Sequence, residues 1–258
     1  MYAAQNVLTR FPWPFPLLER YAFANVQMML PITPAAESVI RRKGYEGRSS
    51  IVPLGVDRDL FMPRAKRRRR FTAGYVGRLE EHKGIRQLLQ AARTVECQLR
   101  IVGNGSLRSL VEEEQRIRPG AIELLPWVSH SELPRELCRM DVLVLPSIPV
   151  VQRNFLPWIK VPLREQFGRV LVEAMACAIP VVATDVGEIA YVVGDSGLLV
   201  APGDCHGLAQ ALLRLRDTPD LADELARNGL KRSAKFDWGV IAKQLLAIWQ
   251  ELAHRAPE

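Results

Sequence analysis

The chain has 258 residues, of which 48% are apolar, and a formal net charge of +7. It is long enough and apolar enough to bury a large core, which excludes wholesale disorder, and its apolar runs are too short to span a bilayer. The opening residues lack the apolar run of a signal peptide, and the four cysteines form no CxxC pattern. These features predict a cytoplasmic protein with reduced thiols rather than a disulfide or metal framework.

The basic excess lies at the front of the chain. The first 70 residues hold 13 Lys or Arg against 5 Asp or Glu, and the run 66–70 reads KRRRR. No aromatic residues interleave this run and no helix-turn-helix pattern accompanies it, so nucleic-acid binding is not expected. The run favours a solvated loop, or a peripheral contact with anionic lipid at the inner membrane face.

Residues 1–60 predict only part of a domain. A Pro-rich and aromatic opening precedes a helix that reaches about Met29, and a second helix is expected at 34–43. The stretch SSIVPLGVDRDLF then predicts a strand and a connecting loop, with 51–63 as a link. These elements are too few to close a core, so they predict a remnant of a larger domain, with apolar surface exposed near Trp13 and Phe15.

From residue 71 onward, apolar strands alternate with amphipathic helices. Strands are expected at 71–76, 98–102, 121–125, 141–145, 180–184 and 197–200. Helices are expected at 84–94, 106–116, 204–216, 221–235 and 237–254, with short helices after 129 and 165. This alternation predicts an α/β domain with a doubly wound parallel sheet over 61–235, and a closing helix at 236–258 that could cross back to the front of the chain.

Ligands of such sheets bind at the carboxyl ends of the strands, and one loop there carries suggestive chemistry. Glu165 and Gly168 precede an apolar helix that contains Glu173. The N-terminus of a helix suits a diphosphate, and carboxylates accept hydrogen bonds from hydroxyl groups. Each glutamate alone could be an ordinary surface or helix residue, but the combination indicates a nucleotide sugar.

Five motifs together resemble the retaining glycosyltransferases of the GT-B fold, specifically the family four group, over about 31–252. In chain order they are IVPLGVDRDLF, VGRLEEHKGI, IVGNGSL, then DVLVLPS with EQFGRVLVEAMACAIPVVATDVGE, and SGLLVAPGD. The resemblance implies two Rossmann-like domains, of which this chain holds the donor-binding one. Most of the amino-terminal acceptor domain, with the catalytic His that it often carries, is expected to be absent.

The resemblance also implies a role for each matching residue. Arg78 and Lys83 would bind the donor diphosphate, and Glu165 would hold the sugar hydroxyls and the reacting face. Glu173 would bind the ribose. The remaining donor-binding positions are Gly77, Gly103, Asn104, Gly105, Trp127, Val128, Gln166, Phe167, Gly168, Val170 and Leu171. Among these, Trp127 and Val128 would lie beside the base or serve only in packing.

Competing motifs are weaker. Asp57-Arg58-Asp59 resembles a metal-binding DxD, but within the link Asp57 more plausibly serves a turn, so no metal and no cofactor beyond the nucleotide-sugar substrate is expected. IVGNG lacks the remainder of a dinucleotide fingerprint. The chain departs from the family at Gly187-Glu188, where a glycine pair is usual, and in the insertion 148–164 with Trp158 and Lys160, which could shape donor or acceptor choice.

The sequence therefore predicts a donor-binding domain that transfers a sugar from a nucleoside diphosphate to a saccharide, lipid or small-molecule acceptor, with retention of anomeric configuration. The alternative is a catalytically inactive donor-binding module, or a subunit completed by a separate acceptor domain. A nucleotide-sugar epimerase is a third and less favoured alternative, because the five motifs fit a transferase better.

Overall fold

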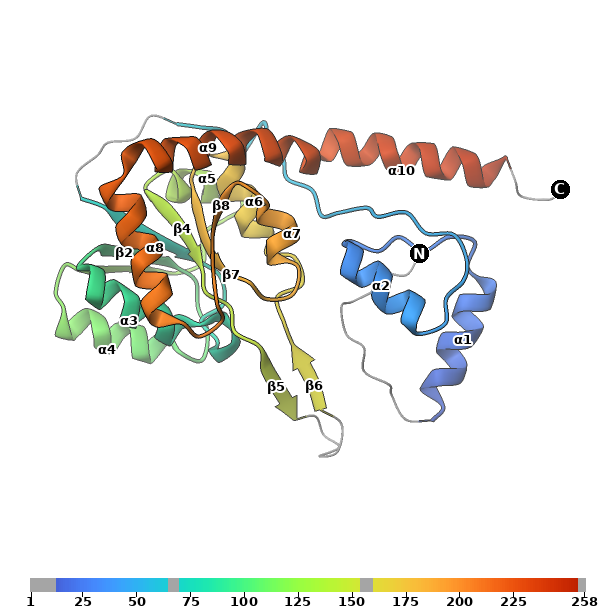
Figure 1. Cartoon of the computed structure of the whole chain (residues 1–258), viewed down its shortest axis with the longest axis horizontal. Coiled ribbons are helices and arrows are strands. Elements are labelled where there is room, and N and C mark those ends of the chain that lie inside the picture. The colour runs from blue at the N-terminus through green and yellow to red at the C-terminus, as the bar shows by residue number, and fades with distance from the viewer. Residues whose placement is uncertain (1–12, 65–69, 154–159, 255–258) are drawn as a thin grey trace.

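Six parallel strands form the central sheet of the computed structural model, which describes residues 13–64, 70–153 and 160–254 (Figure 1). The strands are β1 Thr72–Val76, β2 Gln98–Val102, β3 Ile122–Leu125, β4 Val142–Leu145, β7 Val181–Thr184 and β8 Gly197–Val200. Their order is β3-β2-β1-β4-β7-β8, and every pairing is parallel. The predicted doubly wound sheet and its six strands are confirmed.

Helices cover both faces of this sheet, as the fully buried β1, β4 and β7 require. On one face, α3 Ile85–Val95 packs against α8 Cys205–Asp217, beside α4 Arg108–Ile117. On the other face lie α5 Leu133–Leu137, α6 Arg169–Ala176 and α7 Ile189–Val193, with α9 Pro219–Ser233 against α6. Because strand order reverses between β1 and β4, their carboxyl ends form the switch point where such sheets bind ligands.

The amino-terminal helices form a small separate cluster. Helix α1 spans Phe15–Asn25, and α2 spans Pro34–Arg42 with Thr33 as its N-cap, whose side chain accepts a hydrogen bond from the Ala36 N–H at 3.2 Å. Met29, Ala36, Ile40 and Tyr45 form the buried core of this cluster. Helix α1 contributes no buried residue to it, which leaves the exposed apolar surface predicted near the front of the chain.

The strand predicted within the stretch 49–61 is wrong. This stretch forms only isolated bridges, from Ser49 to Met29 and from Val56 to Asp237. Pro53 and Gly55 interrupt the apolar pattern, and the backbone hydrogen bonds of Ser50 and Val52 with residues 29–31 do not extend into a ladder. The segment therefore runs as an extended link.

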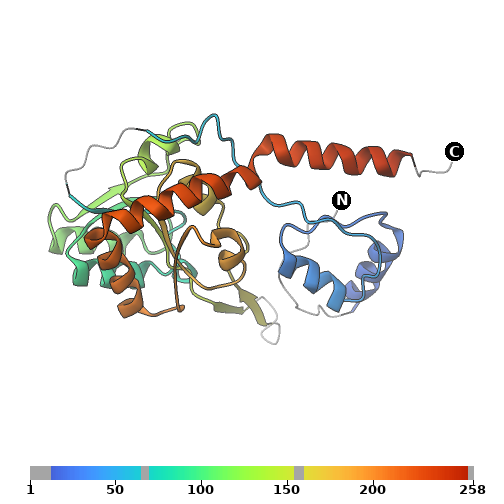
Figure 2. The same ribbon diagram turned by 45° about the horizontal axis from the view of Figure 1, so that its top comes forward.

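The last helix, α10 Trp238–Ala253, crosses back to the amino-terminal cluster after the short turn η2 Ala234–Phe236 (Figures 1 and 2). Its Ile241 and Ile248 are buried with Met28, Leu30 and Val52. Arg48 Nη2 and Glu251 Oε1 add an ion pair at 2.6 Å. A second link comes from α7, because Glu188 Oε2 lies 3.5 Å from the Ala35 N–H at the start of α2. The departure at position 188 thus places a carboxylate at a helix N-terminus.

Two paired strands form within the predicted insertion 148–164. Strands β5 Val150–Arg153 and β6 Lys160–Leu163 pair antiparallel with each other, and the pair projects away from the parallel sheet (Figure 1). Trp158, singled out from the sequence, lies outside the described residues, as do residues 66–69 of the basic run. Among the described residues, no helix combines the length and apolar character needed to cross a membrane.

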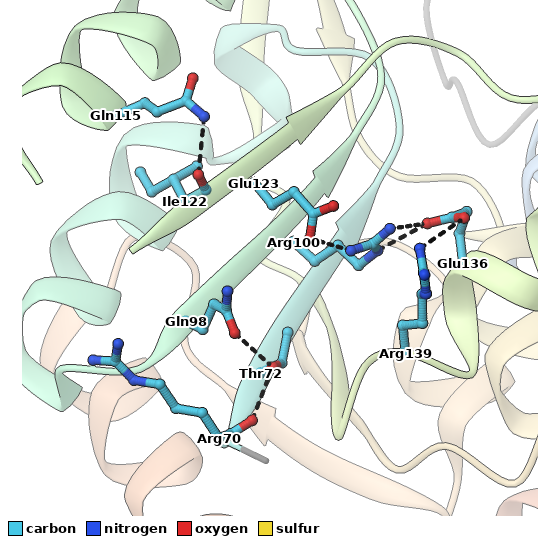
Figure 3. A network of polar contacts seen from close by, with 9 residues as sticks. All are labelled: Arg70, Thr72, Gln98, Arg100, Gln115, Ile122, Glu123, Glu136 and Arg139. Atoms are coloured by element: carbon cyan, nitrogen blue, oxygen red, sulfur yellow. Dashed lines mark hydrogen bonds and ion pairs between the residues drawn. The ribbon is translucent and has the colours of Figure 1, made fainter. Parts of the chain in front are cut away.

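A buried ion network ties β2 to its neighbours (Figure 3). Arg100 of β2 is only 5% exposed, and its guanidinium pairs with Glu123 of β3 and with Glu136 of α5. The parallel register aligns Arg100 directly with Glu123. Arg139 Nη1 adds a second cation 3.6 Å from Glu136 Oε1. A buried charge costs several kcal/mol of desolvation unless it is paired, so each buried member of this network depends on its partners.

Candidate functional site

The loops that follow β1 and β4 meet at the switch point. Lys83 ends the 3-10 turn η1 Glu81–Lys83, and its Nζ lies 2.5 Å from Glu165 Oε2. The side chains of both residues are mostly buried, at 16% and 12% exposure. Lys83 and Glu165, two of the three predicted catalytic residues beside Arg78, are 82 positions apart in the chain, and the fold brings them into an ion pair.

Further hydrogen bonds fix the position of Glu165. Ser147, which is buried just after β4, donates its hydroxyl to Glu165 Oε2 at 3.2 Å. The Thr184 hydroxyl at the end of β7 donates in turn to the Ser147 carbonyl at 2.5 Å. The His82 carbonyl accepts a hydrogen bond from the Ile148 N–H at 2.9 Å, which joins the same two loops. The Glu165 carboxylate is therefore held by Lys83 and Ser147, and Thr184 at the end of β7 supports Ser147.

Glu173 lies in a second polar cluster on α6. Its carboxylate is 4% exposed and contacts Arg169 Nε at 3.1 Å and His130 Nε2 at 3.3 Å. The His130 ring packs on Phe61, with 4.9 Å between ring centroids. Burial raises the pKa of the Glu173 carboxyl above its ordinary 4.5, and Arg169 and His130 offset part of the rise.

The glycines after β1 and β2 let two loops approach each other. A Cβ on Gly103 would lie 2.0 Å from the Gly77 carbonyl oxygen, and Gly103 has a φ of +151°. The Leu79 N–H donates to the Asn104 carbonyl at 2.9 Å, and the Asn104 Oδ1 accepts from the Gly105 N–H at 2.9 Å. Close backbone packing therefore accounts for Gly103, and the paired loops form one wall of the carboxyl edge.

Helix α6 begins at this edge with Gly168 as its N-cap, at a φ of +68°. The Val170 N–H has no hydrogen-bond partner within the described part of the chain, so it can receive a ligand. The Leu171 N–H instead donates to the Gly168 carbonyl at 2.8 Å and is already used. Phe167 is buried against Phe236 at 5.6 Å between ring centroids, so only its backbone can face a ligand.

The remaining predicted residues differ in how far their side chains are exposed. Arg78 is exposed, and its guanidinium has no hydrogen bond or ion pair within the described residues. Gln166 is half-buried. Trp127 is 54% exposed, whereas Val128 packs against the core. Trp127 is thus the member of this pair that is free to contact a base.

Sequence reasoning missed four residues of the edge: His130, Ser147, Glu80 and Ser106. The Glu80 carboxylate accepts from the Ser106 hydroxyl at 2.7 Å and from its N–H at 3.2 Å, and these bonds lower the pKa of Glu80. Each of the four lies two to five residues beyond the end of a strand of the central sheet. Their positions were therefore available from the sequence, but their partners were not.

A metal site is not built into the described part of the chain, where no three His, Cys, Asp or Glu side chains gather around a common point. The Asp57 carboxylate accepts from the Asp59 N–H at 3.0 Å and the Leu60 N–H at 3.1 Å. This is the hydrogen bonding of an Asx turn, which confirms the turn predicted for Asp57.

The family is decided by a match over residues 70–218 to the protein family described as glycosyl transferases group 1. The chain belongs to this family. This group 1 glycosyl transferase chain is 32% identical over 217 residues to the MMP alpha-(1->4)-mannosyltransferase of Mycolicibacterium hassiacum, covering 80% of this chain and 49% of that protein. The chain spans about half the length of the relatives it matches.

Comparison with solved structures gives the fold of the chain. Sucrose-phosphate synthase from Thermosynechococcus elongatus superposes with a TM-score of 0.75 at 28% identity, over 93% of this chain and 62% of that one. HepE of Anabaena, solved in complex with UDP-glucose, superposes with a TM-score of 0.72 at 20% identity, over 91% and 66%. The chain therefore has the Rossmann-like fold of the carboxyl-terminal GT-B domain.

Burial of the Glu173 carboxylate predicts that the free energy of unfolding depends on pH. A raised pKa in the folded state means that the carboxylate lowers stability above that pKa, and that this cost disappears as the pH falls toward 4.5. Glu173→Gln should therefore be more stable than the natural chain at pH 7 to 8, and this advantage should shrink at pH 5. Urea unfolding of both chains across this range measures the difference, and an advantage that grows on acidification would contradict the burial argument.

Proposed function

We propose that this chain binds a nucleoside-diphosphate sugar at the carboxyl edge of its sheet and acts as the donor half of a retaining glycosyltransferase. The observation that carries the proposal is the Lys83–Glu165 ion pair at the switch point. Glu173 adds a second carboxylate about one turn into α6, the helix that begins at the same edge. The sugar would pass to a saccharide, lipid or small-molecule acceptor with retention of anomeric configuration.

The cations and the helix terminus serve the diphosphate. Lys83 brings an ammonium group, and within the described part of the chain the Arg78 guanidinium and the Val170 N–H at the start of α6 have no partner. Positive groups fixed where negative charge grows stabilise the departure of a nucleoside diphosphate without a metal ion. Because Lys83 is also bound to Glu165, it links the leaving group to the carboxylate that faces the sugar.

The carboxylates serve the hydroxyl groups. Glu165, with the backbone of Gln166, Phe167 and Gly168, would hold the sugar, and Glu173 would accept hydrogen bonds from the ribose. Trp127 is exposed in a position to pack on the base. Since HepE was solved with UDP-glucose, uridine nucleotides are a suitable first probe.

A second candidate is a donor-binding module that needs a separate acceptor domain. The exposed side chains of α1 favour it, because Leu17, Leu18 and Tyr21 are 54%, 60% and 71% exposed. Apolar side chains gathered on one helix mark a surface that another protein part covers. In both candidates we place the amino-terminal remnant at 1–60, the donor domain at 61–235 and the crossing helix at 236–258.

Thermal unfolding with UDP, GDP, ADP and dTDP, each with and without Mg²⁺, tests the donor proposal. A nucleotide at about a hundred times its dissociation constant should stabilise the chain by roughly 2.7 kcal/mol, which is visible as a higher Tm. We expect a shift with one nucleotide that does not need Mg²⁺. The absence of a shift with all four would overturn the proposal. Binding without any sugar release from the matching nucleotide sugar would favour the second candidate.

A further inference from the structure

A cavity of about 440 Å³ opens at the edge of the sheet opposite the donor site. Phe71, Asp141 and Pro180 line it, and each directly precedes a strand, namely β1, β4 and β7. The donor residues follow the carboxyl ends of the same strands. The cavity is therefore separated from the donor site by the length of the strands, and none of the proposed donor residues lines it.

Part of the cavity wall is apolar. It is formed by the start of β1, the end of α8, one side of α9 and the turn before β7, through Phe71, Ala178, Pro180, Leu215, Ala222 and Leu230. Ligand cavities of about 300 to 1,000 Å³ take small organic molecules, with apolar walls that contact the body of the ligand and a few polar groups that orient it. The volume and the apolar wall thus suit a small ring or a short chain.

The polar part of the wall is rich in arginine. Arg64, Arg70, Arg216 and Arg227 line the cavity together with two acids, Asp141 and Asp223. Asp141 Oδ2 already accepts a hydrogen bond from the Thr72 N–H at 2.9 Å. The four guanidinium groups outnumber the carboxylates, so the cavity attracts an anion.

Two of these arginines are anchored and two have open donors. Arg70 Nη2 donates to the Glu96 carbonyl at 3.3 Å, and Arg216 Nη1 donates to the Val95 carbonyl at 3.0 Å. Arg216 also pairs with Asp217 at 2.7 Å. Arg64 and Arg227 have no hydrogen bond or ion pair within the described residues. The planar fork of a guanidinium matches the oxygens of a phosphate.

We propose that this cavity is a second ligand site that binds a phosphate monoester, with Arg64 and Arg227 on the phosphate and the apolar wall on the ester group. The phosphate could belong to a soluble metabolite or to a lipid headgroup, since both present the same dianionic oxygens. The site does not depend on donor binding, because it uses different residues at the opposite edge of the sheet.

Phenyl phosphate is the soluble probe. Its titration, followed by the amide NMR signals of Ala178, Ala222 and Ala226, reports on the cavity alone. The double variant Arg64→Gln/Arg227→Gln should weaken this binding at least tenfold. The matched control Arg20→Gln/Arg135→Gln removes the same charge from exposed positions outside the cavity and should leave the affinity unchanged.

Sedimentation with vesicles supplies the lipid arm. Phosphatidylcholine vesicles with and without phosphatidic acid are compared for the natural chain and both variants. The site is supported if either probe binds the natural chain and the control variant but not the cavity variant. Binding of phenyl phosphate in the cavity then indicates a soluble metabolite, and sedimentation that depends on phosphatidic acid indicates a lipid headgroup. The proposal is overturned if neither probe binds, or if the cavity variant binds as well as the control.

Discussion

Arg100→Ala should lower the free energy of unfolding by about 3 to 5 kcal/mol, the range for breaking a buried ion pair from one side. The guanidinium is 6% exposed and pairs with the mostly buried Glu136, which is 11% exposed. After truncation, the one cation left beside Glu136 among the described residues is Arg139, with Nη1 at 3.6 Å, and the desolvation of Glu136 is no longer offset. Glu123 is 48% exposed and can turn to water, so the cost comes from the α5 side of the network.

Urea unfolding monitored by circular dichroism measures this loss. Arg116→Ala is the matched control, because Arg116 pairs with Glu113 on the exposed face of α4 with 73% of its side chain in solvent. The double variant Arg100→Met/Glu136→Leu removes both buried charges and should recover most of the stability. A loss below about 1 kcal/mol in Arg100→Ala would show that water reaches Glu136, contrary to the buried network.

Glu173→Ala should weaken nucleotide binding at least tenfold, since a hydrogen bond to a charged acceptor contributes about 1.5 to 3 kcal/mol. The carboxylate lies at the donor edge with Arg169 and His130 beside it, and the alanine variant offers the ribose no acceptor there. Burial of the carboxylate lowers stability at neutral pH, so its removal should leave the chain folded.

Calorimetric titration with the nucleotide selected by thermal unfolding measures the affinity of this variant. Glu224→Ala, an exposed acid on α9, is the matched control and should bind as the natural chain does. An unchanged affinity in Glu173→Ala would remove the ribose role from the proposal. Circular dichroism of the variant separates a lost contact from a lost fold.

Pattern and spacing predicted the scaffold well. The apolar run VLVL became a strand buried on both faces, and a strand so placed must lie inside a parallel sheet. The meeting of Lys83 and Glu165 also followed from topology, because both come after strands whose carboxyl ends share one edge. The roles assigned to these residues remain predictions.

The unpredicted features depend on pairings between distant residues. The contact of His130 with Glu173 forms only if the loop after β3 extends to α6, and the path of that loop could not be predicted from the sequence. The Arg100 network depends on strand register and on the placement of α5, since its partners lie 23 and 36 positions away. The strand expected within 49–61 failed for the same reason, because a ladder needs a neighbouring strand and this stretch finds only isolated bridges to Met29 and Asp237.

Amide NMR mapping of the natural chain, titrated in turn with UDP, GDP and ADP, tests the central claim most directly. We expect one nucleotide to shift amide signals along the carboxyl edge of the sheet. The affected residues should be Gly77 to Lys83, Gly103 to Ser106, Trp127 to His130 and Gln166 to Glu173. Shifts confined to the opposite edge around Phe71 and Ala178, or none with any of the three, would contradict it.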